Sequence, residues 1–164
     1  IFFFNISTNI YALEKIVYID VNYIFNNSSA GKKINKEITN KSKKINSDFN
    51  DYKKKIDTQR EKLIKQKNVI SNEDFKKKIT VLEKEIQEYT AAINKKKVDL
   101  SNFKNKVIIN FTKQLQPILE NYSKENSISM ILRKEEILIG KTNLDVTKNI
   151  LDLFDKKVKK IKTE

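Results

Sequence analysis

The chain has 164 residues, with 34 Lys and Arg against 21 Asp and Glu, and the resulting net charge is +13. The sequence contains no Cys and no His, which excludes thiol catalysis, disulfides, His-based acid–base chemistry and most metal sites. Two Gly and one Pro are too few for a Rossmann or phosphate-loop fingerprint or for a turn-rich β-sandwich. These features favour a Lys-rich, mainly α-helical binding or structural protein that is not an enzyme and needs no cofactor.

Residues 1–12 are apolar and uncharged, unlike the rest of the chain, and they end at Ala12. A short apolar run, a polar stretch and a small final residue are typical of the second half of a secretory signal peptide. We therefore predict a signal peptide remnant over residues 1–12, a mature chain beginning at Leu13, and export. The alternative interpretation is a short apolar strand or a frayed terminus.

The first element expected in the mature chain is a strand at residues 15–19, because this run is β-branched and aromatic. Asp20 follows the run and can cap a short helix over residues 21–25. Ser28 or Ser29 can then cap the next helix.

Two long helical stripes occupy the middle of the chain. The first has apolar residues at helical spacing between about residues 30 and 70, namely Ile34, Ile38, Ile45, Phe49, Tyr52, Ile56, Leu63 and Ile70. Ser71 and Asp74 then form an N-terminal capping pattern. The second stripe comprises Phe75, Ile79, Leu82, Ile86, Tyr89, Ile93, Leu100, Phe103, Val107, Phe111, Leu115, Ile118 and Tyr122. Two stripes separated by a tight break predict an antiparallel helical hairpin.

The remaining segment is shorter and mixed. Residues 127–132 and 137–140 are apolar runs on either side of the charged residues 133–136, which predicts a β-hairpin. Asp145 or Thr147 is expected to cap a final helix. The apolar residues of that helix would share one face, and they are Ile150, Leu151, Phe154, Val158 and Ile161. We therefore expect the two ends of the chain, residues 13–31 and 125–164, to form one small body. The arms, residues 32–124, are expected to project from it.

Nearly all of the positive charge falls on the arms. Residues 32–124 contain 24 Lys and Arg and 12 Asp and Glu, a net charge of +12, which leaves +1 for the rest of the chain. A field of this sign attracts anionic partners. The positive charge is densest in three lysine runs. The first comprises Lys53, Lys54 and Lys55, the second Lys76, Lys77 and Lys78, and the third Lys95, Lys96 and Lys97. Any single run, taken alone, is more simply a solvated helix face.

The order of these elements resembles the Skp/OmpH-like family of periplasmic chaperones. The resemblance is carried at the start by KIVYIDVNYIF (residues 15–25) and SAGKK (residues 29–33). At the end it is carried by ISMIL (residues 128–132), ILI (residues 137–139) and LDVT (residues 144–147). It covers the whole predicted mature chain.

The resemblance implies a mainly α fold with a small β body, in which a long antiparallel helical hairpin projects from a β-barrel-like trimerisation body. It also implies an ATP-independent periplasmic holdase that binds unfolded outer-membrane proteins. The expected client-binding residues are the nine lysines of the three runs. The body is too small to hold a robust core alone, and its expected trimer contacts are Ile16, Val17, Ile19, Ile128, Met130, Ile131 and Leu138. Contact with anionic lipid or lipopolysaccharide is a further expectation.

Two other functions fit parts of the sequence. A structural coiled-coil adaptor of the cell envelope would have similar long arms, but it would not need the terminal β body. A cytosolic, basic coiled-coil protein that binds nucleic acid would use the same lysines. The chain has only two arginines and no groove-reading motif, so we expect no nucleic-acid partner. Export would separate these alternatives, because an exported chain does not meet genomic DNA.

Overall fold

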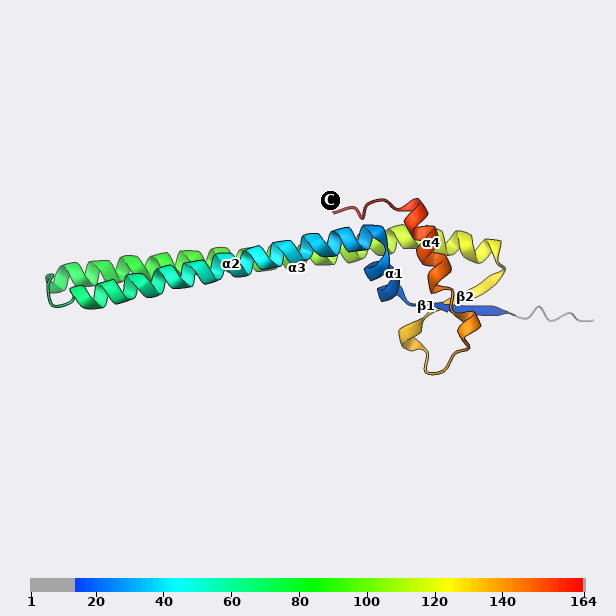
Figure 1. The fold of residues 1–164 in the computed structure, drawn as a ribbon, viewed down its shortest axis with the longest axis horizontal. Helices are drawn as coiled ribbons and strands as arrows, with labels where there is room; N and C mark the ends of the chain where they lie inside the picture. Colours follow the sequence, from blue (N-terminus) through cyan, green and yellow to red (C-terminus); the bar gives the residue numbers. More distant parts are fainter. Residues whose placement is uncertain (1–13, 164) are drawn as a thin grey trace, which may run out of the picture. The chain divides into compact units, whose positions relative to one another are not determined.

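The computed structural model describes residues 14–163 of the chain, and the predicted signal peptide and its cleavage site lie outside this range. In chain order the elements are β1 (Lys15–Ile19), α1 (Val21–Asn27), α2 (Ser29–Gln66), α3 (Asn72–Glu125), β2 (Ile128–Arg133) and α4 (Thr147–Lys157) (Figure 1). Short 3₁₀ turns occupy Lys134–Glu136 and Thr142–Leu144. The chain divides into two compact units. The body unit contains Thr112–Lys160 and the residues up to Gly31, and the arm unit contains Lys32–Phe111 and the residues from Ile161 onward.

The body unit contains a two-stranded sheet, in which β1 pairs with β2 in parallel. Ile16 lies opposite Met130, and Val17 lies opposite Ile131. Parallel pairing requires a long crossover connection, and here the connection comprises α1, α2 and α3. The strand predicted at residues 15–19 is therefore confirmed, and it pairs with a segment more than 100 residues away in sequence.

The β-hairpin predicted around residues 133–136 is wrong. β2 continues to Arg133 and is followed by a 3₁₀ turn, and residues 137–140 form no strand. The turn is held from outside: Lys134 Nζ lies 4.0 Å from an Asp20 carboxylate oxygen and 3.8 Å from one of Asp145. Because the segment lacks a favoured two-residue turn sequence, the chain leaves the sheet after Arg133. Leu138 is consequently fully exposed.

The core of the body unit forms where α1 packs against α4. Ile24 of α1 and Ile150 and Phe154 of α4 are completely buried. The predicted cap of α1 is confirmed, because the Asp20 carboxylate accepts a hydrogen bond of 2.7 Å from the Tyr23 backbone N–H. The start of α4 differs in detail: Val146 is the N-cap residue, and the Asp145 carboxylate, one position earlier, accepts a hydrogen bond of 2.9 Å from the Thr147 N–H.

A tight corner joins α1 to α2, and it explains two small residues of the sequence. The Ser28 hydroxyl is buried and accepts a hydrogen bond of 3.1 Å from the Gly31 N–H, as predicted for a capping serine. A Cβ atom built on Gly31 would lie only 1.7 Å from the Phe25 carbonyl oxygen. Only glycine fits where the two helices approach so closely.

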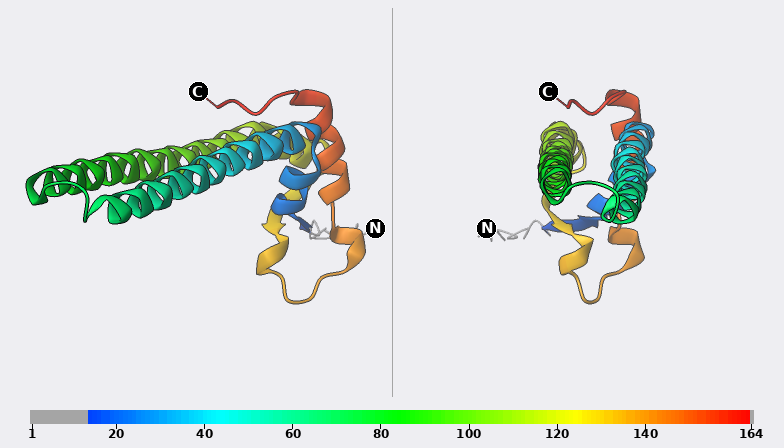
Figure 2. Two further views of the ribbon diagram at one scale, coloured as in Figure 1. Left: turned by 60° about the vertical axis from the view of Figure 1, so that its left-hand side comes forward. Right: turned by 90° about the vertical axis from the view of Figure 1, so that its left-hand side faces the viewer.

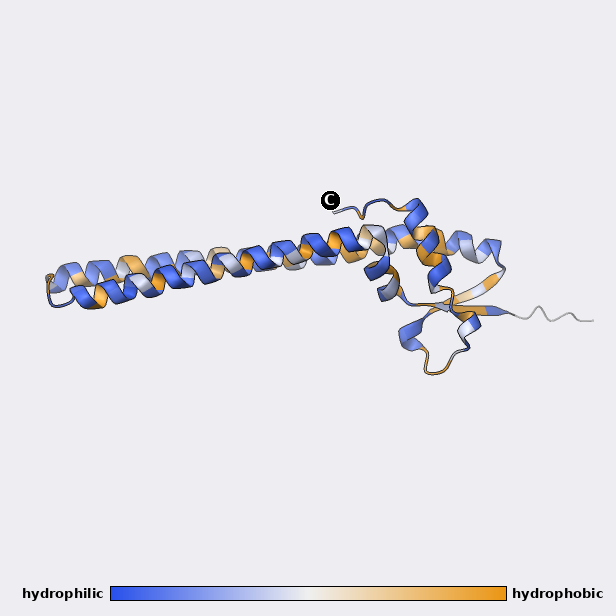
Figure 3. Cartoon of the chain, viewed as in Figure 1, coloured by the Kyte–Doolittle hydropathy of each residue, from blue (hydrophilic) through white to orange (hydrophobic). Residues whose placement is uncertain are grey.

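The arm unit is the predicted antiparallel helical hairpin (Figures 1 and 2). α2 has 38 residues and α3 has 54, so α2 alone is about 57 Å long. The tip is capped as expected, because Ser71 Oγ accepts a bond of 3.1 Å from the Asp74 N–H. The buried residues along the seam between the helices are Ile34, Ile45, Ile56, Leu63, Leu82, Ile93, Val107 and Phe111. All eight belong to the two predicted stripes, and hydrophilic residues make up most of the rest of the two helices (Figure 3).

Candidate binding surfaces of the helical arm

An apolar cluster lies in the distal half of the arm. Ile56, Leu63 and Leu82 are its buried members, and Tyr52, Phe75, Ile79 and Ile86 pack against them. A recess of about 270 Å³ opens over this cluster, lined in part by Phe75 and Ile79 and flanked by the charged residue Arg60. The neighbouring residues Ile64 and Val69 are largely exposed. This part of the arm therefore presents apolar surface, with Arg60 and Glu83 as the charged residues that line the recess.

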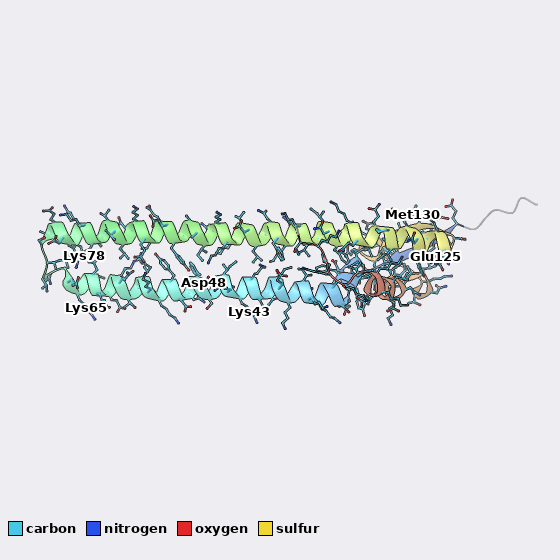
Figure 4. The ribbon with its side chains drawn as sticks, turned by 90° about the horizontal axis from the view of Figure 1, so that it is seen from above. Lys43, Asp48, Lys65, Lys78, Glu125 and Met130 are labelled. Atoms are coloured by element: carbon cyan, nitrogen blue, oxygen red, sulfur yellow. The ribbon has the colours of Figure 1, made fainter. Side chains whose placement is uncertain are left out.

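The middle of the seam is polar, unlike the apolar distal cluster. Tyr52 and Tyr89 stack with ring centroids 3.5 Å apart and an interplanar angle of 13°. The Tyr89 hydroxyl donates a hydrogen bond of 2.6 Å to the Asp48 backbone carbonyl. Asp48 lies between the two helices (Figure 4), and its carboxylate accepts from Lys96 Nζ at 3.0 Å. These contacts join α2 to α3 at one definite register.

Each predicted lysine run contains one residue that ties the helices together. Lys55 Nζ lies 2.6 Å from a Glu85 carboxylate oxygen. Lys78 Nζ donates to the Gln66 side-chain carbonyl at 2.9 Å, and Lys96 reaches Asp48 as described. Sequence reasoning missed this division, although the carboxylate and amide partners on the opposite helix could have suggested it.

The other six lysines of the runs are exposed: Lys53, Lys54, Lys76, Lys77, Lys95 and Lys97. Lys77 pairs with Glu73 on its own helix at 2.9 Å, and Lys97 Nζ lies 5.7 Å from the centroid of the Phe49 ring. The structure thus spreads the runs around both helices and does not bring them into one patch. Their role in client binding stays a prediction.

The cross-seam pairs shift the titration of their members. The hydrogen bond from Lys96 holds the pKa of Asp48 below its usual value, and that from Lys55 does the same for Glu85. The Lys55 pKa is raised by the same Glu85 hydrogen bond. Burial raises the pKa of the Tyr52 phenol. All four groups therefore keep the charge state that the seam requires at neutral pH.

A second recess, of about 370 Å³, lies beside this polar section. Its lining is apolar at Ile45, Leu100 and Phe103 and charged at the remaining positions, which are Lys41, Lys44, Asp48, Lys96 and Asp99. Lys41 Nζ lies 5.1 Å from the centroid of the Phe103 ring, within the range of a cation–π interaction. The arm thus offers recesses with apolar walls at two separate places, one bordered by ammonium groups and the other by the Arg60 guanidinium.

The residues predicted for trimer contacts divide into three groups in the body unit. Val17 and Ile19 are buried within the unit itself. Ile16 and its partner across the sheet, Met130, are exposed, as is Leu138. Ile128 and Ile131 are half-buried. The exposed members leave apolar surface next to the sheet, and their part in a trimer stays a prediction.

Within residues 14–163, no group of three or more acidic residues is arranged to hold a metal ion. In the same range, none of the helices has the length and apolar character that crossing a membrane requires.

These observations define a class: a protein with a small α/β body unit and a long, basic, antiparallel helical hairpin. The chain belongs to the family of OmpH-like outer membrane proteins, whose profile matches residues 15–154. This confirms the resemblance carried by the terminal segments. A crystal structure from Caulobacter crescentus CB15, described as an OmpH-like outer membrane chaperone, is similar with a TM-score of 0.82 and 13% sequence identity. The match covers 92% of this chain and 89% of that one, and at this identity it shows a shared fold. Comparison with curated proteins gave no match.

Proposed function

We propose that this protein is an ATP-independent holdase chaperone that binds unfolded outer-membrane proteins in the periplasm and prevents their aggregation. The observation that carries the proposal is the arm of an OmpH-like family member, with an apolar recess bordered by lysines in its middle and a second apolar recess beside Arg60 in its distal half. The structural relative is itself described as an outer membrane chaperone. An unfolded client exposes apolar side chains, which the recesses shelter through many weak contacts.

The charge of the arms supplies the second part of the mechanism. A net charge of +12 over residues 32–124 attracts acidic clients over distances of about 8–10 Å at physiological salt. Contact with anionic lipid or lipopolysaccharide would use the same charge. Because each contact is weak and exposed, release needs no nucleotide and proceeds by contacts opening in turn.

We propose that the working form is a homotrimer held by the body units. Exposed apolar side chains beside a two-stranded sheet, those of Ile16, Met130, Leu138 and Ile139, support this assembly. A short sheet with open edges also needs partners. Copies of the chain would supply them, and the arms would then surround a shared client.

The test is light scattering of a urea-denatured β-barrel membrane protein diluted into buffer with the purified chain, without ATP and across a salt series. We expect aggregation to be suppressed at low salt and less so as salt rises. Unchanged aggregation at a clear molar excess of the chain would refute the chaperone function. If aggregation is suppressed equally at all salt concentrations, the chaperone function holds and apolar contacts alone account for client binding.

A further inference from the structure

The segment that follows α4 binds along α3 in the described structure. The chain leaves helical geometry at Val158, with φ −111° and ψ 105°, and residues 158–163 form no helix or strand (Figure 1). Ile161 is 1% exposed, whereas Lys160 and Lys162 are exposed. From Lys160 to Lys162 the segment buries one side chain between two solvated ones, as a short extended stretch on a surface does, and residues 159–160 form a bend before it.

Side-chain amides of α3 hold the backbone of this segment. Within the arm unit, Asn110 Nδ2 donates to the Lys162 carbonyl at 3.0 Å. Within the body unit, Gln114 Nε2 donates to the Lys160 carbonyl at 3.2 Å. Two backbone carbonyls of the segment, two residues apart, thus accept hydrogen bonds from two side-chain amides of α3 that are four residues apart. The spacing matches, because two extended residues advance about 6.6 Å and four helical residues rise about 6.0 Å.

The same spacing of N–H donors continues along α3 into the arm unit. Counting back from Asn110 in steps of four gives Lys106 and then Asn102, and both are exposed. The donors wind around the helix by about 40° per step, so a flexible chain can follow them more readily than a rigid strand. The row of donors thus extends two steps beyond Asn110, the donor that holds Lys162 in the described structure.

A groove accompanies these donors. It has a volume of about 550 Å³, and Thr163 lines it together with Asp99, Asn102, Phe103, Asn105, Lys106 and Ile109. Ile109 is 53% exposed and supplies an apolar wall beside the donors. The groove therefore begins at Thr163, and it combines potential backbone-binding donors with an apolar contact.

We propose that this groove binds an extended segment of an unfolded client, which continues the path of residues 161–163 along α3. The client chain would run in the direction opposite to α3, as residues 160–163 do, with its carbonyls accepting from Lys106 and Asn102. Its apolar side chains would fall at alternate positions, against Ile109 and Phe103. That alternation is the pattern of a membrane β-strand, so the groove selects the sequence class expected of the clients in the proposed function, on which this inference rests.

Photo-crosslinking at single positions tests the groove. A benzoylphenylalanine at Asn105, which lines the groove, is compared with one at Ser101, which lines a different recess beside Ser42 and Asn46. Each variant is mixed with a urea-denatured β-barrel membrane protein and irradiated. We expect the yield of client crosslinks to be at least fivefold higher from Asn105 than from Ser101. An excess of a peptide in which Val and Thr alternate should reduce that yield. A peptide of the same composition, with all of its Val residues placed before its Thr residues, should not reduce it.

A pair of charge variants gives a second measurement. Ile109→Lys removes the apolar wall, whereas Val81→Lys adds the same charge at an exposed position of α3 outside the groove. We expect a five- to tenfold weaker affinity for the alternating peptide with Ile109→Lys and less than a twofold change with Val81→Lys. Circular dichroism checks that both variants stay folded.

The outcomes separate the groove from the chaperone function. Suppressed aggregation with equal client crosslinks from Asn105 and Ser101 would overturn the groove and leave the holdase intact. If Asn105 crosslinks only within its own chain, the groove binds the segment after α4. If it crosslinks only to a second copy of the chain, the groove serves self-association. Either outcome would also overturn the proposal. A protein that neither suppresses aggregation nor crosslinks to the client would fail both proposals.

Discussion

The ring of Tyr52 stacks on the ring of Tyr89, with centroids 3.5 Å apart, at the middle of the seam between α2 and α3. The Tyr89 hydroxyl donates to the Asp48 carbonyl one turn away. Apolar seams of this kind tolerate sliding by a heptad, because one Ile resembles the next. The stacked pair has no equivalent one heptad along in either direction, so it fixes which residues of α2 face which residues of α3.

The first prediction follows from this pair. Tyr89→Ala should lower the free energy of unfolding by about 2–4 kcal/mol, because it removes the ring stack, its buried area and a hydrogen bond. Tyr89→Phe keeps the stack and should cost only about 1 kcal/mol. Urea unfolding followed by circular dichroism measures both. Equal losses for the two variants would show that the hydroxyl, and not the stack, carries the effect.

The second prediction concerns acid. The folded-state pKa values of Asp48 and Glu85 are lowered, so their pairs stabilise the arm above the unfolded pKa values, which are near 4. That contribution is lost as pH falls through the lower folded values. Stability should therefore be flat between about pH 6 and 9 and fall below about pH 4. The double variant Asp48→Asn, Glu85→Gln should show a shallower decline in urea unfolding measured from pH 7 to 3. An identical decline would assign acid sensitivity to other carboxylates.

The third prediction concerns the corner between α1 and α2. Gly31→Ala places a methyl group against the Phe25 carbonyl, where a Cβ would lie at 1.7 Å, and should destabilise the body unit by about 3 kcal/mol or more. Gly140→Ala is the matched control, because its Cβ would first meet a Tyr18 ring carbon at 3.0 Å. Thermal unfolding compares the two. A tolerated Gly31→Ala would mean that the corner can open without cost.

The fourth prediction concerns assembly. Leu138 and Ile139 are almost fully exposed, so Leu138→Lys with Ile139→Lys should leave the fold of each chain intact and weaken the proposed trimer. Analytical ultracentrifugation should show a shift toward monomer, whereas Val69→Lys, a charge added at the tip of the arm, should leave the mass unchanged. If the variant keeps the native mass, Leu138 and Ile139 do not contribute to the interface between chains.

Local signals in the sequence were sufficient for most of the elements. The two stripes predicted the helical hairpin, because a 3.6-residue period and a cap such as Ser71 depend only on neighbouring residues. The strand at residues 15–19 and the cap at Asp20 followed for the same reason. The basic character of the arms needed only the count of charged residues, and the terminal segments were enough to indicate the family.

Contacts between distant residues decided the rest. The partner of β1 is a parallel strand more than 100 residues away, and the local pattern around residues 133–136 favoured a hairpin that does not form. Which lysine of each run reaches the opposite helix, as Lys96 does, depends on the register of α2 against α3. The burial of Ile161 against the arm depends on where the segment after α4 lies. Periodicity describes one element at a time, so relationships such as these exist only once the elements have packed together.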